Sequence, residues 1–143
     1  MKVLNLLHLA PLAGAFFPTK FRDGLEGRPG TSHEALTVES LSELASTWDI
    51  ISSNATAADG TVYLPRSVVN AIRAVGRASA EVDVLETTDA TWHFDGERIY
   101  EGQLLLTALR GAIVSSLQQG DGETARAFLG KALHGVQDFY AHT

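Results

Sequence analysis

Apolar residues recur every three or four positions along most of this chain, and this helical period constrains the fold more than any other feature. Four segments carry the pattern: 31–48, about twenty residues from Leu64, 97–118, and 123 to the end. A period of two, which half-buried strands need, is not sustained over a strand's length, and the sequence has no internal repeat. The sequence therefore predicts an all-α fold, a bundle of about four main helices.

The ends of these helices carry their own signals. Thr31 and Glu34 have capping-box spacing, Pro65 stands near the start of the second helix, and 120–122 forms the turn before the last. We interpret 50–63 as a loop and 87–95 as a break between helices. The residues expected to face inward are Val38, Leu41, Leu44, Ala45 and Trp48 in the first helix, Val68, Ile72, Val75, Ser79 and Val82 in the second, and Leu104, Leu105, Ala108, Leu109, Ala112, Ile113 and Leu117 in the third.

The composition fits one globular domain and excludes several kinds of site. The 143 residues are 45% hydrophobic and 20% charged, which is ordinary for a folded protein. A formal net charge of −6 argues against stable nucleic-acid binding, which needs a basic face. The chain has no cysteine, so disulfides, thiolate metal sites and thiol nucleophiles are excluded. Any metal must be held by His, Asp and Glu.

The first fifteen residues have the pattern of a secretory signal peptide. Lys2 precedes a short apolar run, and residues 13–15 read A-G-A, the form of a cleavage site. The run is shorter than the roughly 20 apolar residues of a membrane-spanning helix, and the alternative is a buried N-terminal strand or helix. We expect cleavage after Ala15 and a secreted single helical domain, residues 16–143. A glycosylation sequon at Asn54 fits export, and no transmembrane segment is expected after residue 15.

The strongest chemical signal lies in the last helix. On a helical wheel, His134, Asp138 and His142 form a column opposite an apolar face that includes Phe128 and Phe139. Small residues flank this column, which indicates close packing there. Side chains four residues apart are neighbours, so His134 and Asp138 can share a metal ion, and Asp138 can bridge two ions with one histidine serving each. The alternative is a surface His–Asp pair followed by a frayed terminal histidine.

Three further residues are candidate ligands. Asp83 projects close to the apolar stripe of its helix, where a carboxylate is costly unless it is paired or metal-bound. The alternative is an ion pair with Arg73 or Arg77 on the same helix. His33 and His93 stand at predicted helix entrances. Their alternatives are a surface position for His33 and a satisfied core or loop histidine for His93.

At these positions the sequence resembles a known family. Residues 130–143 read G-K-A-L-H-G-V-Q-D-F-Y-A-H-T and resemble the G-x-x-L-H-x-x-x-D-F-x-x-H segment of HET-C-type heterokaryon incompatibility proteins. They are similarly close to the N-terminal domain of von Willebrand factor A domain-containing protein 7. Residues 31–34 resemble the early helix start of these domains, and Asp83 with 92–97 resembles their D…H-F-D-x-E block.

These domains are distantly similar to the all-helical zinc-dependent phospholipase C and the P1-type nucleases. In those enzymes three clustered zinc ions activate a water that attacks a phosphodiester. The resemblance therefore implies two or three zinc ions here, with manganese as an alternative, and a catalytic position beside the water for Asp138. The zinc ligands that it implies are His33, Asp83, His93, His134, Asp138 and His142. The family continues past the last histidine with further helices and an H-x-x-x-E pair, so we expect the domain to be truncated at its C-terminus.

Three functions follow as hypotheses. The first is a secreted zinc-dependent phosphodiester hydrolase that acts on phospholipid or nucleic acid. The second is a non-catalytic, metal-stabilised interaction domain, and the third is an incompatibility or cell-death recognition domain that works by contact. A catalytic ion keeps a water ligand, whereas a structural ion is closed by protein ligands. Because the C-terminal ligands of the family are missing, we favour a metal-binding domain over a hydrolase.

Overall fold

The computed structural model describes residues 32–48 and 63–142, without the side chain of His142. Its long elements are α1 (His33–Ser46), α3 (Arg66–Leu85), α5 (Ile99–Gln118) and α6 (Gly122–His142), joined by the short helix α4 (Ala90–His93) and the 3-10 turn η2 (Asp95–Glu97). No strand occurs in these ranges, which confirms the predicted all-α bundle of four main helices. None of these helices is long and apolar enough to span a membrane. The predicted signal peptide, residues 1–15, and Asn54 lie outside the described residues.

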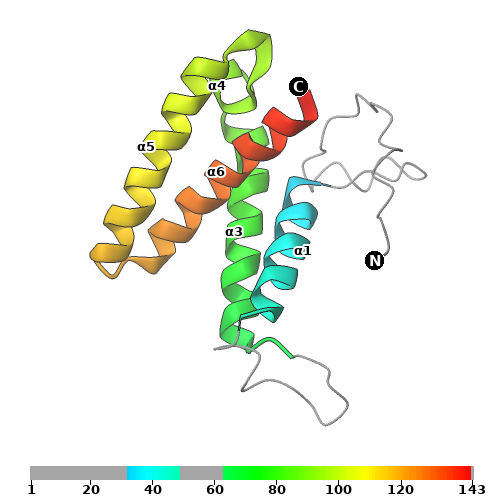
Figure 1. The fold of residues 1–143 in the computed structure, drawn as a ribbon, viewed down its shortest axis with the longest axis vertical. Coiled ribbons are helices and arrows are strands. Elements are labelled where there is room, and N and C mark those ends of the chain that lie inside the picture. The colour runs from blue at the N-terminus through cyan, green and yellow to red at the C-terminus, as the bar shows by residue number, and fades with distance from the viewer. Residues whose placement is uncertain (1–31, 49–62, 143) are drawn as a thin grey trace, which may run out of the picture.

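Helices α3 and α6 cross at the centre of the bundle. Helix α1 packs on α3 and helix α5 packs on α6, so α1 and α5 lie on opposite sides of the central pair (Figure 1). The short helix α4 packs against α5 and α6 near the C-terminal end of α6. As a result, segments from α1, α3, α4 and α6 meet in one region.

Helix α3 buries the face that its sequence predicts. Ile72, Val75, Ser79 and Val82 are all buried, and a helical period of apolar and small residues explains this stripe. The helix begins directly after Pro65, whose fixed φ suits a helix start. Because neighbours pack on this face along much of its length, α3 is the scaffold for the rest of the described fold.

The crossing of α6 over α3 depends on Gly130. A Cβ atom at this position would collide with the Val75 carbonyl and come within 2.6 Å of the Ala78 Cβ atom. The two helices therefore meet almost backbone to backbone, as predicted from the small residues beside the His–Asp column. The next turns of α6 place His134 and Asp138 directly against α3.

The inward faces of α1 and α5 differ from the prediction. Helix α1 buries Thr37 and Ala45, whereas Leu44 and Trp48 are about half exposed. Helix α5 buries Leu109, and the predicted inward residues that are exposed instead are Leu104, Ala108 and Leu117. Each helix packs mainly on one neighbour, so only a narrow stripe is covered, and the packing rather than the apolar content fixes its direction.

Two predicted boundaries also change. The N-cap of α1 is Ser32, whose hydroxyl accepts a hydrogen bond from the Ala35 amide at 3.1 Å, while Thr31 lies outside the described residues. The break expected over 87–95 contains α4, which begins at Ala90 after the N-cap Asp89. A four-residue helix is too short to show periodicity, so the sequence pattern could not reveal it.

Candidate metal centre

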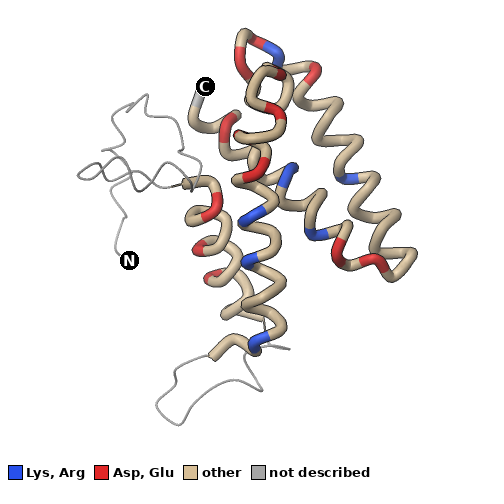
Figure 2. Tube along the Cα trace, turned by 180° about the vertical axis from the view of Figure 1, so that it is seen from behind, with Lys and Arg blue, Asp and Glu red and all other residues tan. Residues whose placement is uncertain are grey.

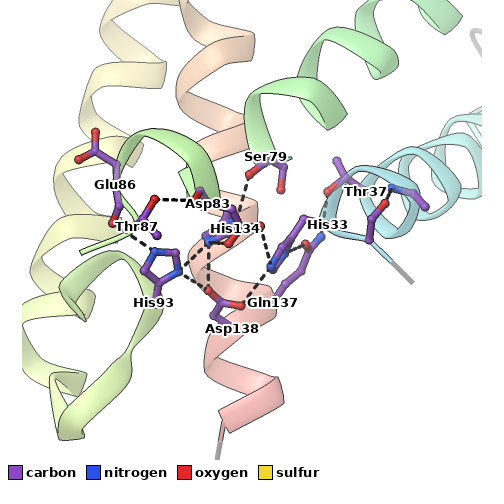
Figure 3. A network of polar contacts seen from close by, with 12 residues as sticks. His33, Thr37, Ser79, Asp83, Glu86, Thr87, His93, His134, Gln137 and Asp138 are labelled. Atoms are coloured by element: carbon purple, nitrogen blue, oxygen red, sulfur yellow. Dashed lines mark hydrogen bonds and ion pairs between the residues drawn. The ribbon is translucent and has the colours of Figure 1, made fainter. Parts of the chain in front are cut away.

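Five of the six predicted ligands converge in the structure. Four separate helices supply them, and all five are buried or nearly so (Figure 3). The residues are His33 from α1, Asp83 from α3, His93 from α4, and His134 and Asp138 from α6. The side chain of the sixth, His142, lies outside the described part of the chain.

Asp138 lies at the middle of the cluster and contacts three imidazoles. Its Oδ2 atom is 2.9 Å from His93 Nδ1 and 3.0 Å from His134 Nε2. Its Oδ1 atom is 3.3 Å from His33 Nε2. The alternative of a surface His–Asp pair is therefore wrong, since His134 is fully buried and Asp138 is 4% exposed.

Asp83 completes the cluster from the side of α3. Its Oδ1 atom is 3.8 Å from His134 Nε2, and its Oδ2 atom is 3.8 Å from His33 Nε2. The Oδ2 atom is buried without a hydrogen-bond partner, which is costly for a carboxylate oxygen. The alternative partners, Arg73 and Arg77, are exposed and line a groove between α1 and α3. The structure thus directs Asp83 toward histidines.

Each histidine of the cluster uses its outer nitrogen to contact a carbonyl oxygen. His134 Nδ1 lies 3.0 Å from the Ser79 carbonyl, and His93 Nε2 lies 3.3 Å from the Glu86 carbonyl. His33 Nδ1 lies 2.7 Å from Gln137 Oε1. Because a carbonyl only accepts, the outer nitrogen carries the proton, and the inner nitrogen of the neutral ring presents a lone pair. Metal-binding histidines are usually oriented in this way.

Two of these inner nitrogens face one another. His93 Nδ1 and His134 Nε2 are 3.1 Å apart, and both outer nitrogens are occupied by carbonyls. Two lone pairs at this distance repel unless a proton or a cation lies between them. A proton or a cation between His93 and His134 would therefore stabilise the cluster.

The ionisation of the cluster follows from its contacts. Burial acts to raise the pKa of Asp138, but hydrogen bonds from His134, His33 and His93, which these imidazoles donate when their inner nitrogens are protonated, outweigh it and hold that pKa far below the usual range. The hydrogen bond to Asp138 raises the pKa of His93. Burial raises the pKa of Asp83, whose histidine contacts are longer. Asp138 is thus an anion that favours a cation beside it.

A strained turn holds His93 in place. Phe94 follows it with a φ of 56°, in the left-handed region that a bulky residue rarely adopts, and its amide closes α4 onto the Ala90 carbonyl. The Phe94 ring packs edge-on against Phe139, at 5.4 Å between centroids, and occupies the space beside Gly102 where a Cβ would collide with it. The packing of this ring stabilises the turn, and so it maintains the strained backbone of Phe94 directly after His93.

One edge of the cluster reaches solvent. The side chains of His33 and His134 are 1% and 0% exposed, whereas those of His93 and Asp83 are 12% and 16% exposed. The cluster is therefore closed on the side of α1 and accessible between α3 and α4. The predicted alternative of a surface position for His33 is wrong.

Sequence reasoning missed the residues behind the ligands. Gln137 contacts His33, and its amide nitrogen donates to Thr37 Oγ1 at 2.8 Å. Ser79 supplies a backbone carbonyl, which no side-chain pattern reveals. One signal was available for Thr37, because it lies four residues after His33 and so shares a helix face with it.

The comparisons with known proteins agree with part of the predicted resemblance. Residues 50–143 match the family model described as the VWA7 N-terminal domain. This range includes Asp83, His93, His134 and Asp138, and it begins after His33. No solved structure matches the chain, so the expected likeness to phospholipase C and P1-type nucleases stays a prediction, as does the likeness to HET-C-type proteins.

Curated relatives carry the same name. The chain is 43% identical over 76 residues to human von Willebrand factor A domain-containing protein 7, covering 51% of this chain and 8% of the relative. The mouse protein is 40% identical over 87 residues and the rat protein 36% over 89, each covering 59% of this chain and 10% of the relative. The chain thus spans about a tenth of the length of these relatives. With the family model covering well over half of its residues, the chain belongs to the VWA7 N-terminal domain family.

Proposed function

We propose that this chain is a zinc-binding domain. The observation that supports this most is the arrangement of three histidines, each with its outer nitrogen on a carbonyl and its inner nitrogen directed toward the Asp138 carboxylate. The proposed ligands are His33, Asp83, His93, His134 and Asp138, with His142 added from its place in the sequence motif.

The donor atoms suit zinc in kind and in spacing. Inner nitrogens and carboxylate oxygens lie between 2.9 and 3.8 Å apart. The ligand atoms of a tetrahedral zinc ion with bonds of about 2.0–2.1 Å are about 3.3 Å from one another. A cation would also supply the missing partner of Asp83 Oδ2. Imidazole and carboxylate without thiolate suit zinc, and manganese is the alternative metal.

Asp138 divides the ligands into two sets. Its Oδ1 atom faces His33, and its Oδ2 atom faces His93 and His134. His134 has one nitrogen left after its contact with Ser79, so it serves a single ion. We therefore propose that the cluster would hold two zinc ions, with Asp138 near both. The donor atoms fall into two overlapping groups, His33, Asp83 and His134, and His93, His134 and Asp138.

Each group offers three donors from the described residues, before His142 is counted; three protein ligands are typical of catalytic zinc, whereas structural sites have four. On this ground, and on the resemblance to phospholipase C and P1-type nucleases, we propose hydrolysis of a phosphodiester as the activity. Bound zinc would supply an activated water and stabilise developing negative charge. Asp83 and His93 lie at the accessible edge of the cluster, so substrate would approach there. Asp138 is more deeply buried and would act as a metal ligand.

The charge distribution bears on the substrate. Figure 2 shows only acidic residues along α1 and several basic residues along α3, and the whole chain has a net charge of −6. Affinity for a long nucleic acid requires many phosphate contacts with Lys and Arg. We therefore propose that the phosphodiester, a lipid headgroup or a short nucleic-acid segment, is held by the metals rather than by a basic face. The signal-like segment 1–15 supports secretion as part of this proposal.

The test is the metal content of the purified chain, measured by mass spectrometry beside His134→Ala and Asp138→Ala. Two zinc ions per wild-type chain, lost in both variants and kept in the surface variant Glu81→Gln, are the expected result. Hydrolysis of bis-p-nitrophenyl phosphate by the loaded chain then tests the activity. A folded wild type without stoichiometric metal would overturn the zinc centre. One tightly held zinc without turnover would favour a metal-stabilised interaction domain, the function expected if HET-C-like recognition by contact is correct.

A further inference from the structure

A buried relay of side chains joins α6 to α1 behind the candidate metal centre. Gln137 lies one residue before Asp138, and its Oε1 atom is 2.7 Å from His33 Nδ1. Its Nε2 atom donates to Thr37 Oγ1 at 2.8 Å. His33 and Thr37 are each 1% exposed, and Gln137 between them is half-buried (Figure 3).

The contact at Thr37 indicates which atoms of the relay donate and which accept hydrogen bonds. In the structure the hydroxyl oxygen of Thr37 acts as a hydrogen-bond acceptor toward α6. The amide nitrogen of Gln137 meets this acceptor, so its Oε1 atom faces His33. An amide oxygen only accepts, and His33 must then carry its proton on Nδ1. Its Nε2 atom presents a lone pair to the carboxylates.

Reversal of the amide would give the opposite arrangement. With the Gln137 nitrogen against Nδ1, the proton of His33 would move to Nε2, toward Asp138 Oδ1 at 3.3 Å and Asp83 Oδ2 at 3.8 Å. That tautomer donates to a carboxylate and cannot bind a metal through Nε2. The same side chains can therefore support a metal-binding and a metal-excluding form of His33.

His33 differs in this respect from the other two histidines. His93 and His134 are hydrogen-bonded to the backbone carbonyls of Glu86 and Ser79, which accept hydrogen bonds and cannot donate them. Among the three histidines of the described cluster, His33 alone is hydrogen-bonded to a side-chain amide, which can rotate to present its NH2 group in place of its oxygen. The adjustable ligand is also the one contributed by α1.

We propose that Gln137, held by Thr37, is a positioning residue that keeps His33 in its metal-binding tautomer and so sets the affinity of the centre for zinc. This inference rests on the proposed zinc centre. Partners in the second shell of metal sites typically change metal affinity by about 10–100-fold when they are removed. Gln137 touches no ion itself and acts through His33.

Four variants separate positioning from packing. Gln137→Glu offers acceptors only and holds the His33 proton on Nδ1, Gln137→Leu keeps the bulk without a hydrogen bond, and Thr37→Val removes the acceptor that orients the amide. Gln103→Leu, on the exposed face of α5, is the matched control. Zinc affinity is measured by competition with a chromophoric chelator at one pH. The tautomer of His33 is read from imidazole nitrogen shifts in the metal-free chain.

We expect zinc affinity to fall by about 10–100-fold in Gln137→Leu, by less in Thr37→Val, and not at all in Gln137→Glu or Gln103→Leu. The Nδ1–H tautomer of His33 should dominate in Gln137→Glu without metal and should decline in Gln137→Leu. Equal zinc affinity of Gln137→Leu and wild type would overturn the positioning role and leave the zinc centre standing. A loss in Gln137→Glu as large as in Gln137→Leu would also overturn it.

A wild type that binds no zinc would instead refute the proposed function. The metal-free nitrogen shifts decide the inference even then, because an unchanged His33 tautomer in Gln137→Leu contradicts it.

Discussion

The pKa values of the two carboxyl groups in the cluster shift in opposite directions, because their contacts differ. Three imidazoles hold Asp138 as an anion, with its pKa far below the usual range despite burial. Asp83 lies 3.8 Å from its two histidines, so burial dominates and raises its pKa. A bound cation would favour the ionised form of both, and Asp83, which has the weaker contacts, would gain more.

The pH dependence of the metal-free chain follows from these shifts. The raised pKa of His93 contributes stability below its unfolded pKa of about 6.5, and this is lost as pH rises through the folded pKa. The lowered pKa of Asp138 contributes stability above an unfolded pKa of about 3.9, and this is lost as pH falls. We expect the free energy of unfolding in EDTA to be highest between about pH 4 and 6.5, measured by urea denaturation.

Asp138→Asn should flatten this profile, because it removes the anion on which the shift of His93 depends, while Glu81→Gln on the exposed face of α3 should not. With zinc in excess the trend above pH 6 should reverse, since metal binding displaces protons from histidine. A metal-free chain whose stability rises steadily from pH 5 to 8 would contradict the assigned contacts of His93.

At the scale of elements, the approach of α6 to α3 brings the ligands together. Gly130 allows the backbones to meet, and the Ser79 carbonyl, one turn further along α3 than Val75, then reaches His134 Nδ1. The same crossing sets Asp83 opposite the inner nitrogen of His134. The proposed metal centre would therefore depend on a helix crossing angle and distance that a single methyl group can change.

Gly130→Ala should destabilise the fold by about 1–3 kcal/mol and weaken zinc binding, because its Cβ collides with the backbone of α3. Gly111→Ala on α5 is the matched control, since its Cβ would meet nothing within 4 Å. Relief of glycine's conformational freedom should make this control more stable by about 0.5–1 kcal/mol. Urea denaturation measures both changes, and equal effects of the two substitutions would show that the helix crossing tolerates the extra atom.

At the scale of the whole molecule, the proposed metal centre joins α1, which packs on α3, to α4 and α6. Helix α1 packs on α3 and supplies His33, α3 itself supplies Asp83, and α4 and α6 supply His93, His134 and Asp138. A site assembled from four helices cannot form in the unfolded chain, so binding of metal at the proposed centre would be coupled to folding.

Zinc should therefore stabilise the folded chain and protect α1 in particular. At a free zinc concentration 100 times the dissociation constant, the free energy of unfolding should rise by about 2.7 kcal/mol. Hydrogen exchange should slow in α1 and α4 on adding zinc, with little local change in α5, which carries no ligand. Equal protection of α5 and α1 would indicate a general stabilisation rather than closure of the centre around His33.

The amino-acid sequence by itself determined the kind of fold and the chemistry of the site. Helical periodicity predicted four main helices, and the spacing of His134 and Asp138 predicted a shared site, because both are local properties of one helix. The absence of cysteine restricted the ligands to nitrogen and oxygen. His33, Asp83 and His93 were candidates from their places in the predicted helices, and the motif resemblance implied them as ligands; the structure brings them to the same place.

Only the tertiary structure decided which faces of α1 and α5 are inside and what orients each candidate ligand. Leu104, Leu117 and Trp48 are apolar yet exposed, while the face of α1 that carries His33 and Thr37 is polar yet buried. Apolar content could not predict this, because the burial of polar side chains is stable only when partners from other helices satisfy them. Those partners, such as the Ser79 carbonyl and the amide of Gln137, are distant in sequence and meet the histidines only through the crossing of the helices.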